Sequence, residues 1–173
     1  MPRRALDTGG TRGIGAAVAD ALRREGCAVL VTGAGSSAGR EGVERATVDF
    51  ADREALARFA GQVATMGVEV LVNNAGINRI APFAAIDPAD FDRLYEVNVR
   101  APMTLCRAVL PGMRERGWGR IVNISSIFGV VGRAQRGSYC ASKFALDGLT
   151  AALAVEAAAD GILANCEIGR AHV

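Results

Sequence analysis

Short apolar runs alternate with segments of helical periodicity along most of this chain. The runs have the length and composition of buried strands and lie at 4–7, 28–31, 46–48, 68–72, 119–125 and 162–166. Helical periodicity lies between them at 14–25, 52–66, 87–116 (with a break near Pro102) and 138–159. This order predicts an α/β fold, a doubly wound parallel sheet of the Rossmann type with helices on both faces. The segment 33–45 is short for a complete crossover helix.

Composition and charge exclude several classes of protein. The 173 residues are 50% hydrophobic with a formal net charge of +2, which fits one globular domain and indicates neither nucleic-acid nor membrane binding. No apolar stretch is long enough to span a bilayer and no signal segment follows Met1, so we expect a cytoplasmic protein. The four cysteines lack metal-ligand spacing and are expected to be reduced. The only histidine is His172, so we expect no metal site and acid–base chemistry from other side chains.

A glycine-rich turn, TGGTRGIG at 8–15, stands between the first predicted strand and the first predicted helix. Its glycines allow a sharp turn, close approach of a pyrophosphate, and tight packing of helix against strand. The following helix N-terminus offers free N–H groups to phosphate. We therefore predict a dinucleotide site that includes Gly9, Thr11, Arg12, Gly13, Ile14 and Gly15.

The residues after the second strand indicate which dinucleotide binds. An acidic side chain there would bind the free ribose hydroxyls of NAD, but no carboxylate occurs before Glu41. Arg12, together with Ser36, Ser37 or Arg40, could hold a 2′-phosphate through charge-assisted hydrogen bonds. We expect NADP(H), with NAD(H) as the alternative; Arg12 could equally be a solvated residue at the helix start.

Tyr139 and Lys143 lie four residues apart in the last predicted helix and share one face of it. Lys143 is the only lysine among 20 basic residues. An ammonium beside a phenol stabilises the phenolate and lowers its pKa, so Tyr139 could exchange a proton with a carbonyl or alcohol oxygen. Ser126 ends the strand 119–125, where sheets of this kind bind ligands, although it could also simply terminate that strand.

These motifs, taken together, resemble the classical short-chain dehydrogenases/reductases. The turn at 8–15, the segment 73–76, Asn98, Ser126 and the Tyr139-x-x-x-Lys143 pair occur in the family's order over residues 4–166. The resemblance implies hydride transfer between a nicotinamide cofactor and a small-molecule carbonyl or secondary alcohol, without a metal. The stretches 81–83 and 117–126 are similar to members that reduce 3-oxoacyl-carrier-protein substrates.

The resemblance also implies a role for each matching residue. Tyr139 would be the general acid/base, and Lys143 would lower its pKa and hold the nicotinamide ribose. Ser126 would hydrogen-bond the reacting oxygen, and Asn98, at a helix kink, would position a water that links Lys143 to solvent. The remaining residues implied to contact the cofactor are Asp49 (at the adenine), Asn74, Ala75 and Gly76.

Alternative interpretations remain open at this point. Asn98 could be an ordinary kink or capping residue, and Asp49 a loop carboxylate. The protein could be an NAD-dependent sugar or polyol dehydrogenase, a non-catalytic dinucleotide-binding protein, or an inactive fragment. An intact Ser126, Tyr139 and Lys143 argue against a non-catalytic protein.

Two features depart from the family pattern. Asp7 stands at the end of the first strand, where an apolar residue is usual, and burial would leave its carboxylate unpaired or protonated. Family members usually continue with a Pro-Gly loop, a helical lid and a seventh strand. We therefore expect an incomplete domain over 1–166, with 167–173 a non-biological tail that matches a translated sequencing adapter. By resemblance, the full-length protein is expected to be a homotetramer or homodimer built on the helices at 100–116 and 138–159.

Overall fold

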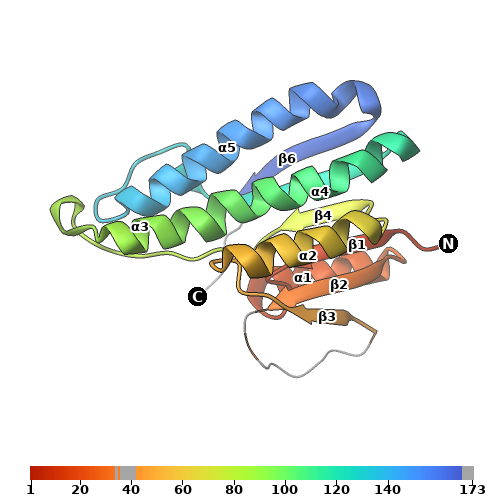
Figure 1. The fold of residues 1–173 in the computed structure, drawn as a ribbon. Helices are drawn as coiled ribbons and strands as arrows, with labels where there is room; N and C mark the ends of the chain where they lie inside the picture. The colour runs from red at the N-terminus through yellow and green to blue at the C-terminus, as the bar shows by residue number, and fades with distance from the viewer. Residues whose placement is uncertain (34, 36–41, 169–173) are drawn as a thin grey trace.

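The computed structural model describes residues 1–33, 35 and 42–168 (Figure 1). In these residues the strands are β1 (Arg4–Thr8), β2 (Ala28–Gly33), β3 (Glu44–Thr47), β4 (Val70–Asn73), β5 (Gly119–Ser125) and β6 (Ile162–Ile168). The α-helices are α1 (Gly13–Arg24), α2 (Arg53–Thr65), α3 (Pro88–Tyr95), α4 (Ala101–Arg116) and α5 (Gly137–Ala157). A π-helical segment, η2 (Glu96–Arg100), joins α3 to α4, and short 3-10 turns lie at η1 (Phe83–Ala85), η3 (Ile127–Gly129) and η4 (Ala158–Asp160).

The strands form one parallel sheet in the order β3-β2-β1-β4-β5-β6. Strand order reverses between β1 and β4, and a ligand is expected at this switch point, beyond the carboxyl ends of the strands. The register places Thr8 opposite Asn73 and Asn73 opposite Asn123, so three neighbouring strands present polar side chains at one level. The predicted Rossmann-type parallel fold is confirmed.

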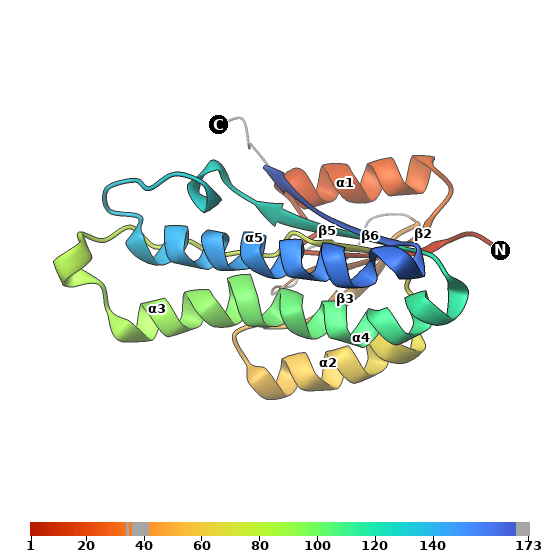
Figure 2. The same ribbon diagram turned by 90° about the horizontal axis from the view of Figure 1, so that it is seen from above.

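Helices cover both faces of the sheet, but unequally. Figure 2 shows α1 on one face and α2, α4 and α5 on the other. The larger core lies on the side of these three helices and includes Leu6, Leu71 and Ile121, all fully buried. The smaller core under α1 consists mainly of small residues, Ala5, Ala19, Val29 and Val31. Between β2 and β3 the described residues form no helix; residues 34 and 36–41 lie outside the description.

The predicted helix break near Pro102 lies earlier in the structure, in the π-helical segment Glu96–Arg100. Pro102 has no N–H to donate to a carbonyl one turn before it, so the helical ladder must be rearranged in the preceding turn. The widened turn holds Asn98, which is 1% exposed. Segments of this kind are rare and occur frequently at functional sites.

Strand boundaries differ from the predicted ones by one or two residues in every strand except β5. The last strand continues two residues past 166, and Glu167 and Ile168 pair with Ile124 and Ser125 of β5. Residues 169–173 lie outside the described residues. The division of the chain into 1–166 and 167–173 therefore stays a prediction.

Asp7 lies in the middle of the sheet and is fully buried, as predicted. Neither of its carboxylate oxygens has a hydrogen-bond partner among the described residues. Burial raises the pKa of Asp7 to about 8, because the charged form loses its hydration without gaining a partner. A Cβ built on Gly10 would contact the Asp7 carboxylate and Val31, so the carboxyl group is enclosed by the turn that follows β1.

Candidate active site

A groove of about 460 Å³ lies at the switch point of the sheet, beside the glycine-rich turn. A second hollow of about 200 Å³ lies beside Tyr139 and Lys143. The two share four lining residues, so they form one continuous groove from the first helix to the start of α5; these residues are Ile14, Asn74, Gly76 and Ile77. Predicted cofactor residues that line the groove are Gly9, Thr11, Arg12, Gly13, Ile14, Asp49, Asn74, Ala75, Gly76, Tyr139 and Lys143.

The glycine-rich turn is fitted closely against the segment that follows β4. A Cβ on Gly15 would collide with the Asn74 amide and would lie 2.6 Å from the Gly9 carbonyl oxygen. The Thr8 hydroxyl accepts hydrogen bonds from the backbone N–H groups of Asn74 (3.0 Å) and Ala75 (3.1 Å). The turn after β1 and the segment after β4 therefore leave no room for a side chain at position 15, which explains the glycine there. Gly13 faces open space, and its positive φ of 55° is what favours glycine there.

The N-terminus of α1 opens into the groove. Arg12 is the N-cap residue, and its side chain makes no capping hydrogen bond. Helix N-termini carry unsatisfied N–H groups and a partial positive charge, so this end of α1 suits a phosphate group. The Arg12 side chain is exposed at the groove and could reach a further phosphate. The predicted partner Ser36 lies outside the described residues.

Asp49 lines the same part of the groove as the N-terminus of α1. Its Oδ1 accepts a hydrogen bond from the Ala51 N–H at 2.9 Å, and its Oδ2 lies 3.7 Å from Nη2 of Arg93. Arg93, Phe50 and Val97 also line this part of the groove, and the sequence analysis did not identify them. Phe50 could have been inferred from its position beside Asp49. Arg93 carries no such signal, because its contact with Asp49 joins segments that are distant in the chain.

Tyr139 and Lys143 lie on the first turns of α5, facing the second hollow. The Lys143 ammonium lies 5.6 Å from the centre of the Tyr139 ring and donates a hydrogen bond to the Ile124 carbonyl oxygen at 2.7 Å. The Ser126 hydroxyl accepts a hydrogen bond from the Phe128 N–H at 3.2 Å and is near enough to the Tyr139 phenol to lower its pKa. The structure thus brings Ser126, Tyr139 and Lys143 together.

Burial is the largest influence on the pKa values of Tyr139 and Lys143. Burial raises the pKa of Tyr139, and this outweighs the opposing effects of the Ser126 hydroxyl and the Arg136 charge. Burial also lowers the pKa of Lys143 to about 8, against the opposing charge of Asp147. In this geometry the ammonium is directed toward the Ile124 carbonyl, and the predicted lowering of the phenol pKa by Lys143 and an oxidised nicotinamide stays a prediction.

Asn98 connects the groove to α5 rather than facing the groove. Its Oδ1 accepts from the Ile77 N–H and its Nδ2 donates to the Ile77 carbonyl, each at 2.9 Å. The same Nδ2 donates to the Ser142 hydroxyl at 3.1 Å, which in turn donates to the Tyr139 carbonyl at 2.8 Å. Its predicted role in a water relay from Lys143 stays a prediction.

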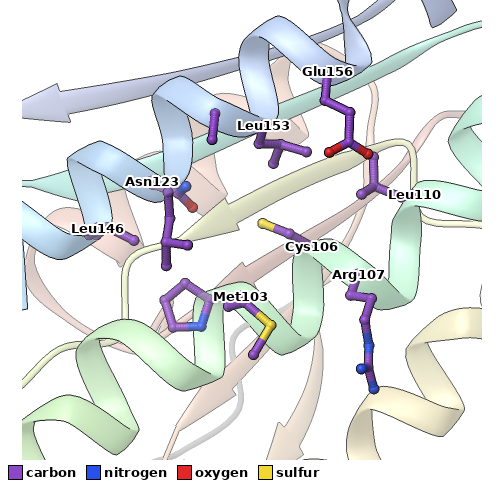
Figure 3. A pocket seen from close by; sticks show the side chains of 11 residues that line it. Met103, Cys106, Arg107, Leu110, Asn123, Leu146, Leu153 and Glu156 are labelled. Atoms are coloured by element: carbon purple, nitrogen blue, oxygen red, sulfur yellow. The ribbon is translucent and has the colours of Figure 1, made fainter.

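An apolar cavity of about 260 Å³ lies apart from this groove, between α4 and α5 (Figure 3). Met103, Cys106 and Leu110 of α4 face Leu146 and Leu153 of α5 across it. The Asn123 amide at its floor is engaged in hydrogen bonds, accepting from Asn73 Nδ2 (2.8 Å) and donating to Thr150 Oγ1 (2.7 Å). The side chains that line this cavity are mostly apolar. The candidate acid–base groups, Tyr139 and Lys143, line the groove instead.

The described residues form neither a metal-binding cluster nor a membrane-spanning helix. No group of three His, Cys, Asp or Glu side chains within the described part of the chain could hold a metal ion. None of the helices described is both long and apolar enough to cross a bilayer.

A parallel Rossmann sheet with a groove that runs from a glycine-rich turn to a Tyr–Lys pair defines the class: a nicotinamide-dependent oxidoreductase. Within this class the chain belongs to the short chain dehydrogenase family, whose model matches residues 3–168.

Individual relatives agree with this assignment. The chain is 36% identical to D-beta-hydroxybutyrate dehydrogenase of Cupriavidus necator, over 93% of this chain and 67% of that protein. It is 40% identical to acetoacetyl-CoA reductase of Rhizobium meliloti, over 95% of this chain and 72% of that protein. A solved metagenomic short-chain oxidoreductase in complex with NADP superimposes with a TM-score of 0.89 at 34% identity, over 98% of this chain and 82% of that one. The chain spans 64% of a solved short-chain dehydrogenase from Streptomyces avermitilis.

Proposed function

We propose that this chain forms the dinucleotide-binding and acid–base part of an NADP(H)-dependent oxidoreductase that interconverts a carbonyl and a secondary alcohol. The observation that carries the proposal is the single groove that joins the turn at 8–15 to Tyr139 and Lys143. A dinucleotide placed along it would have its phosphates at the N-terminus of α1 and its nicotinamide beside Tyr139. The family match over 3–168 supports this arrangement.

The side chains at the nicotinamide end would divide the chemistry between them. The nicotinamide, when bound, supplies or accepts the hydride at the substrate carbon. Tyr139 gives a proton to the carbonyl oxygen, or takes one from the alcohol, within reach of the Ser126 hydroxyl. Ser126 donates to the reacting oxygen and stabilises the negative charge that develops on it. Lys143, which lines the hollow beside Tyr139, holds the ribose and, as an ammonium, favours the phenolate form of Tyr139.

We infer NADP(H) rather than NAD(H) as the preferred cofactor. Arg12 presents an exposed guanidinium at the phosphate end of the groove, and a solved relative has NADP bound. The sequence places Ser36 and Arg40 after β2, where a 2′-phosphate would lie. An NAD-dependent enzyme would need a carboxylate there, and Glu41 is the first acidic residue in that stretch.

The substrate class we propose is a short 3-oxoacyl or 3-hydroxyacyl compound. The support is the identity of 36% and 40% to relatives named for hydroxybutyrate and acetoacetyl-CoA. We also propose a cytoplasmic protein, because Cys27, Cys106, Cys140 and Cys166 are all free thiols.

We propose a homotetramer or homodimer for the full-length protein, with α4 and α5 at the interface. The outer surfaces of these helices expose large apolar side chains: Met103, Phe144, Leu149 and Val155. Val155 is 83% exposed, and contact with a second copy would remove it from water. Light scattering should show a dimer or tetramer that Val155→Glu converts to smaller species.

The decisive experiment pairs Tyr139→Phe with Tyr95→Phe. Tyr95 is the other tyrosine of the chain; it lies on α3 and is 41% exposed. NADPH binding and NADPH-dependent reduction of acetoacetyl-CoA should be measured separately. Tyr139→Phe should bind NADPH normally and lose at least 10²-fold in turnover, while Tyr95→Phe keeps both. Undiminished turnover in Tyr139→Phe would refute the role given to this phenol. Binding without turnover in the unmutated chain would favour a non-catalytic protein.

A further inference from the structure

Behind Lys143 lies a second group of polar side chains that the proposed reaction does not use. This group, which we call the rear cluster, consists of Ser125 at the end of β5, Asp147 and Thr150 on α5, and Cys166 on β6. Burial raises the pKa of the Cys166 thiol, and Thr150 and Asp147 are near enough to influence it. The cluster therefore brings polar side chains together from α5 and the neighbouring strands β5 and β6.

Asp147 is the charged member of the rear cluster, and its surroundings are tightly fitted. Its Oδ1 is buried and has no hydrogen-bond partner among the described residues. A Cβ built on Gly129 would collide with the Asp147 carboxylate and would lie 2.9 Å from the Ser125 hydroxyl. Gly129 therefore leaves the room that this carboxylate needs. A half-buried carboxylate with an unpaired oxygen is costly unless a nearby positive charge stabilises it.

The positive charge available to Asp147 is Lys143, one helical turn earlier on the same face of α5. The Lys143 side chain is 5% exposed, and its ammonium makes one hydrogen bond, to the Ile124 carbonyl of β5. The titratable groups that face it are Tyr139 and Asp147 on α5 and Cys166 on β6. From the segment after β4 it meets Gly76, where a Cβ would lie 3.9 Å from Nζ.

We propose that Asp147 is a positioning residue that acts through Lys143: its carboxylate, one helical turn away on the same face of α5, keeps the buried amine in the ammonium form. This role for Asp147 rests on the proposed function, because only ribose binding and stabilisation of the Tyr139 phenolate require Lys143 to be an ammonium. Asp147 acts through Lys143 and touches neither cofactor nor substrate.

The direction of the charge effects agrees with this geometry. Burial lowers the pKa of Lys143 to about 8, and Asp147 is the largest influence that raises it. Without Asp147 the remaining influence in that direction is Cys166, a thiol whose pKa is itself raised to about 11 and which is neutral near pH 7. Loss of the carboxylate should therefore lower the pKa of Lys143 and reduce the ammonium fraction at neutral pH.

Because Lys143 is the only lysine, its titration can be followed directly. Incorporation of lysine labelled with ¹³C at Cε gives one lysine signal, whose shift reports ionisation of the amine against pH. In Asp147→Asn the midpoint should fall by about one pH unit relative to the unmutated chain, a tenfold loss of proton affinity. Asp147→Glu keeps a carboxylate at this position, so its lysine midpoint should lie close to that of the unmutated chain. A purely structural role for Asp147 would change stability without this pattern.

Glu156→Gln is the matched control, because Glu156 lies on the same helix, is exposed and pairs with Arg114 instead. Its lysine midpoint should equal that of the unmutated chain. An unchanged midpoint in Asp147→Asn would overturn the proposal. If Asp147→Asn does not fold, the ¹³Cγ signal of Asp147 is followed against pH in the unmutated chain and assigned by comparison with Asp147→Glu. This signal must shift at the pH of the lysine midpoint, and the absence of such a shift would also overturn the proposal. Neither measurement needs turnover, so inactivity would count against the proposed function alone.

Discussion

Asn98 and Ser142 are joined by a hydrogen bond of 3.1 Å between Asn98 Nδ2 and Ser142 Oγ. The Ser142 hydroxyl donates a hydrogen bond to the Tyr139 carbonyl oxygen. The Asn98 side chain accepts from the Ile77 N–H and donates to the Ile77 carbonyl oxygen. One buried amide thus fixes the wall of the groove and the helical turn that carries the phenol relative to each other. The π-helical segment brings Asn98 to this position.

Replacing Asn98 should therefore loosen both sides of the groove. Asn98→Ala removes three hydrogen bonds of a buried side chain and leaves both backbone groups of Ile77 without these partners. The free energy of unfolding should fall by about 2–4 kcal/mol. Urea denaturation measures this change, and Asn78→Ala, at an exposed position close by, is the control. Equal stabilities for the two variants would contradict the role assigned to Asn98.

Gly15 and Gly61 should respond oppositely to a methyl group. Gly15→Ala places a Cβ against Asn74 and Gly9, so we expect a loss of about 1–3 kcal/mol from overpacking and weaker NADPH binding. Gly61→Ala lies in α2 with no neighbour within 4 Å of the new Cβ, so a gain of about 0.5–1 kcal/mol is expected from helix propensity. Denaturant midpoints and NADPH fluorescence test both. A stabilised Gly15→Ala would show that the turn is not packed as described.

Much of the fold and of the groove could be predicted from the sequence because local patterns determine them. Apolar runs separated by helical segments specify a parallel sheet, and the carboxyl ends of its strands necessarily meet at one edge. This places the turn at 8–15 and the segment 73–76 together before any coordinates are known. The four-residue spacing of Tyr139 and Lys143 likewise places them on one helix face.

The remaining features depend on contacts between distant segments, which no local pattern encodes. The direction of the Lys143 ammonium follows from the Ile124 carbonyl on β5, and the Asp49–Arg93 pair joins a loop to a helix far along the chain. Asp147 is an exception, since its spacing of four residues from Lys143 on one helix was visible in the sequence and could have identified it.

Arg12 should discriminate between the two dinucleotides. Arg12→Gln removes the exposed guanidinium at the phosphate end of the groove, so the dissociation constant for NADPH should rise about tenfold while that for NADH stays unchanged. Arg24→Gln, in the last turn of the same helix, is the control and should affect neither. Calorimetric titration of each variant with both nucleotides measures the difference. A parallel loss of NADH affinity would show that Arg12 binds the shared pyrophosphate instead.

Asp7 should make the stability of the chain fall as pH rises. Its pKa is raised from 3.8 to about 8 in the folded chain, so between these values the folded state keeps a proton that the unfolded state has lost. The free energy of unfolding then decreases with pH over this range, by at most about 1.4 kcal/mol per pH unit. Below this range both states are protonated and the effect is absent.

Asp7→Val tests this directly, because valine is apolar and β-branched and therefore suits a buried strand beside Val31. The variant should be more stable than the unmutated chain at pH 7 by several kcal/mol, and the difference should shrink toward about pH 4 as the Asp7 carboxyl becomes protonated in both states. Urea unfolding at a series of pH values measures it, with Asp92→Asn, an exposed carboxylate on α3, as the control. A constant difference between the two curves from acid to neutral pH would mean that Asp7 is ionised in the folded chain and that a partner compensates its charge.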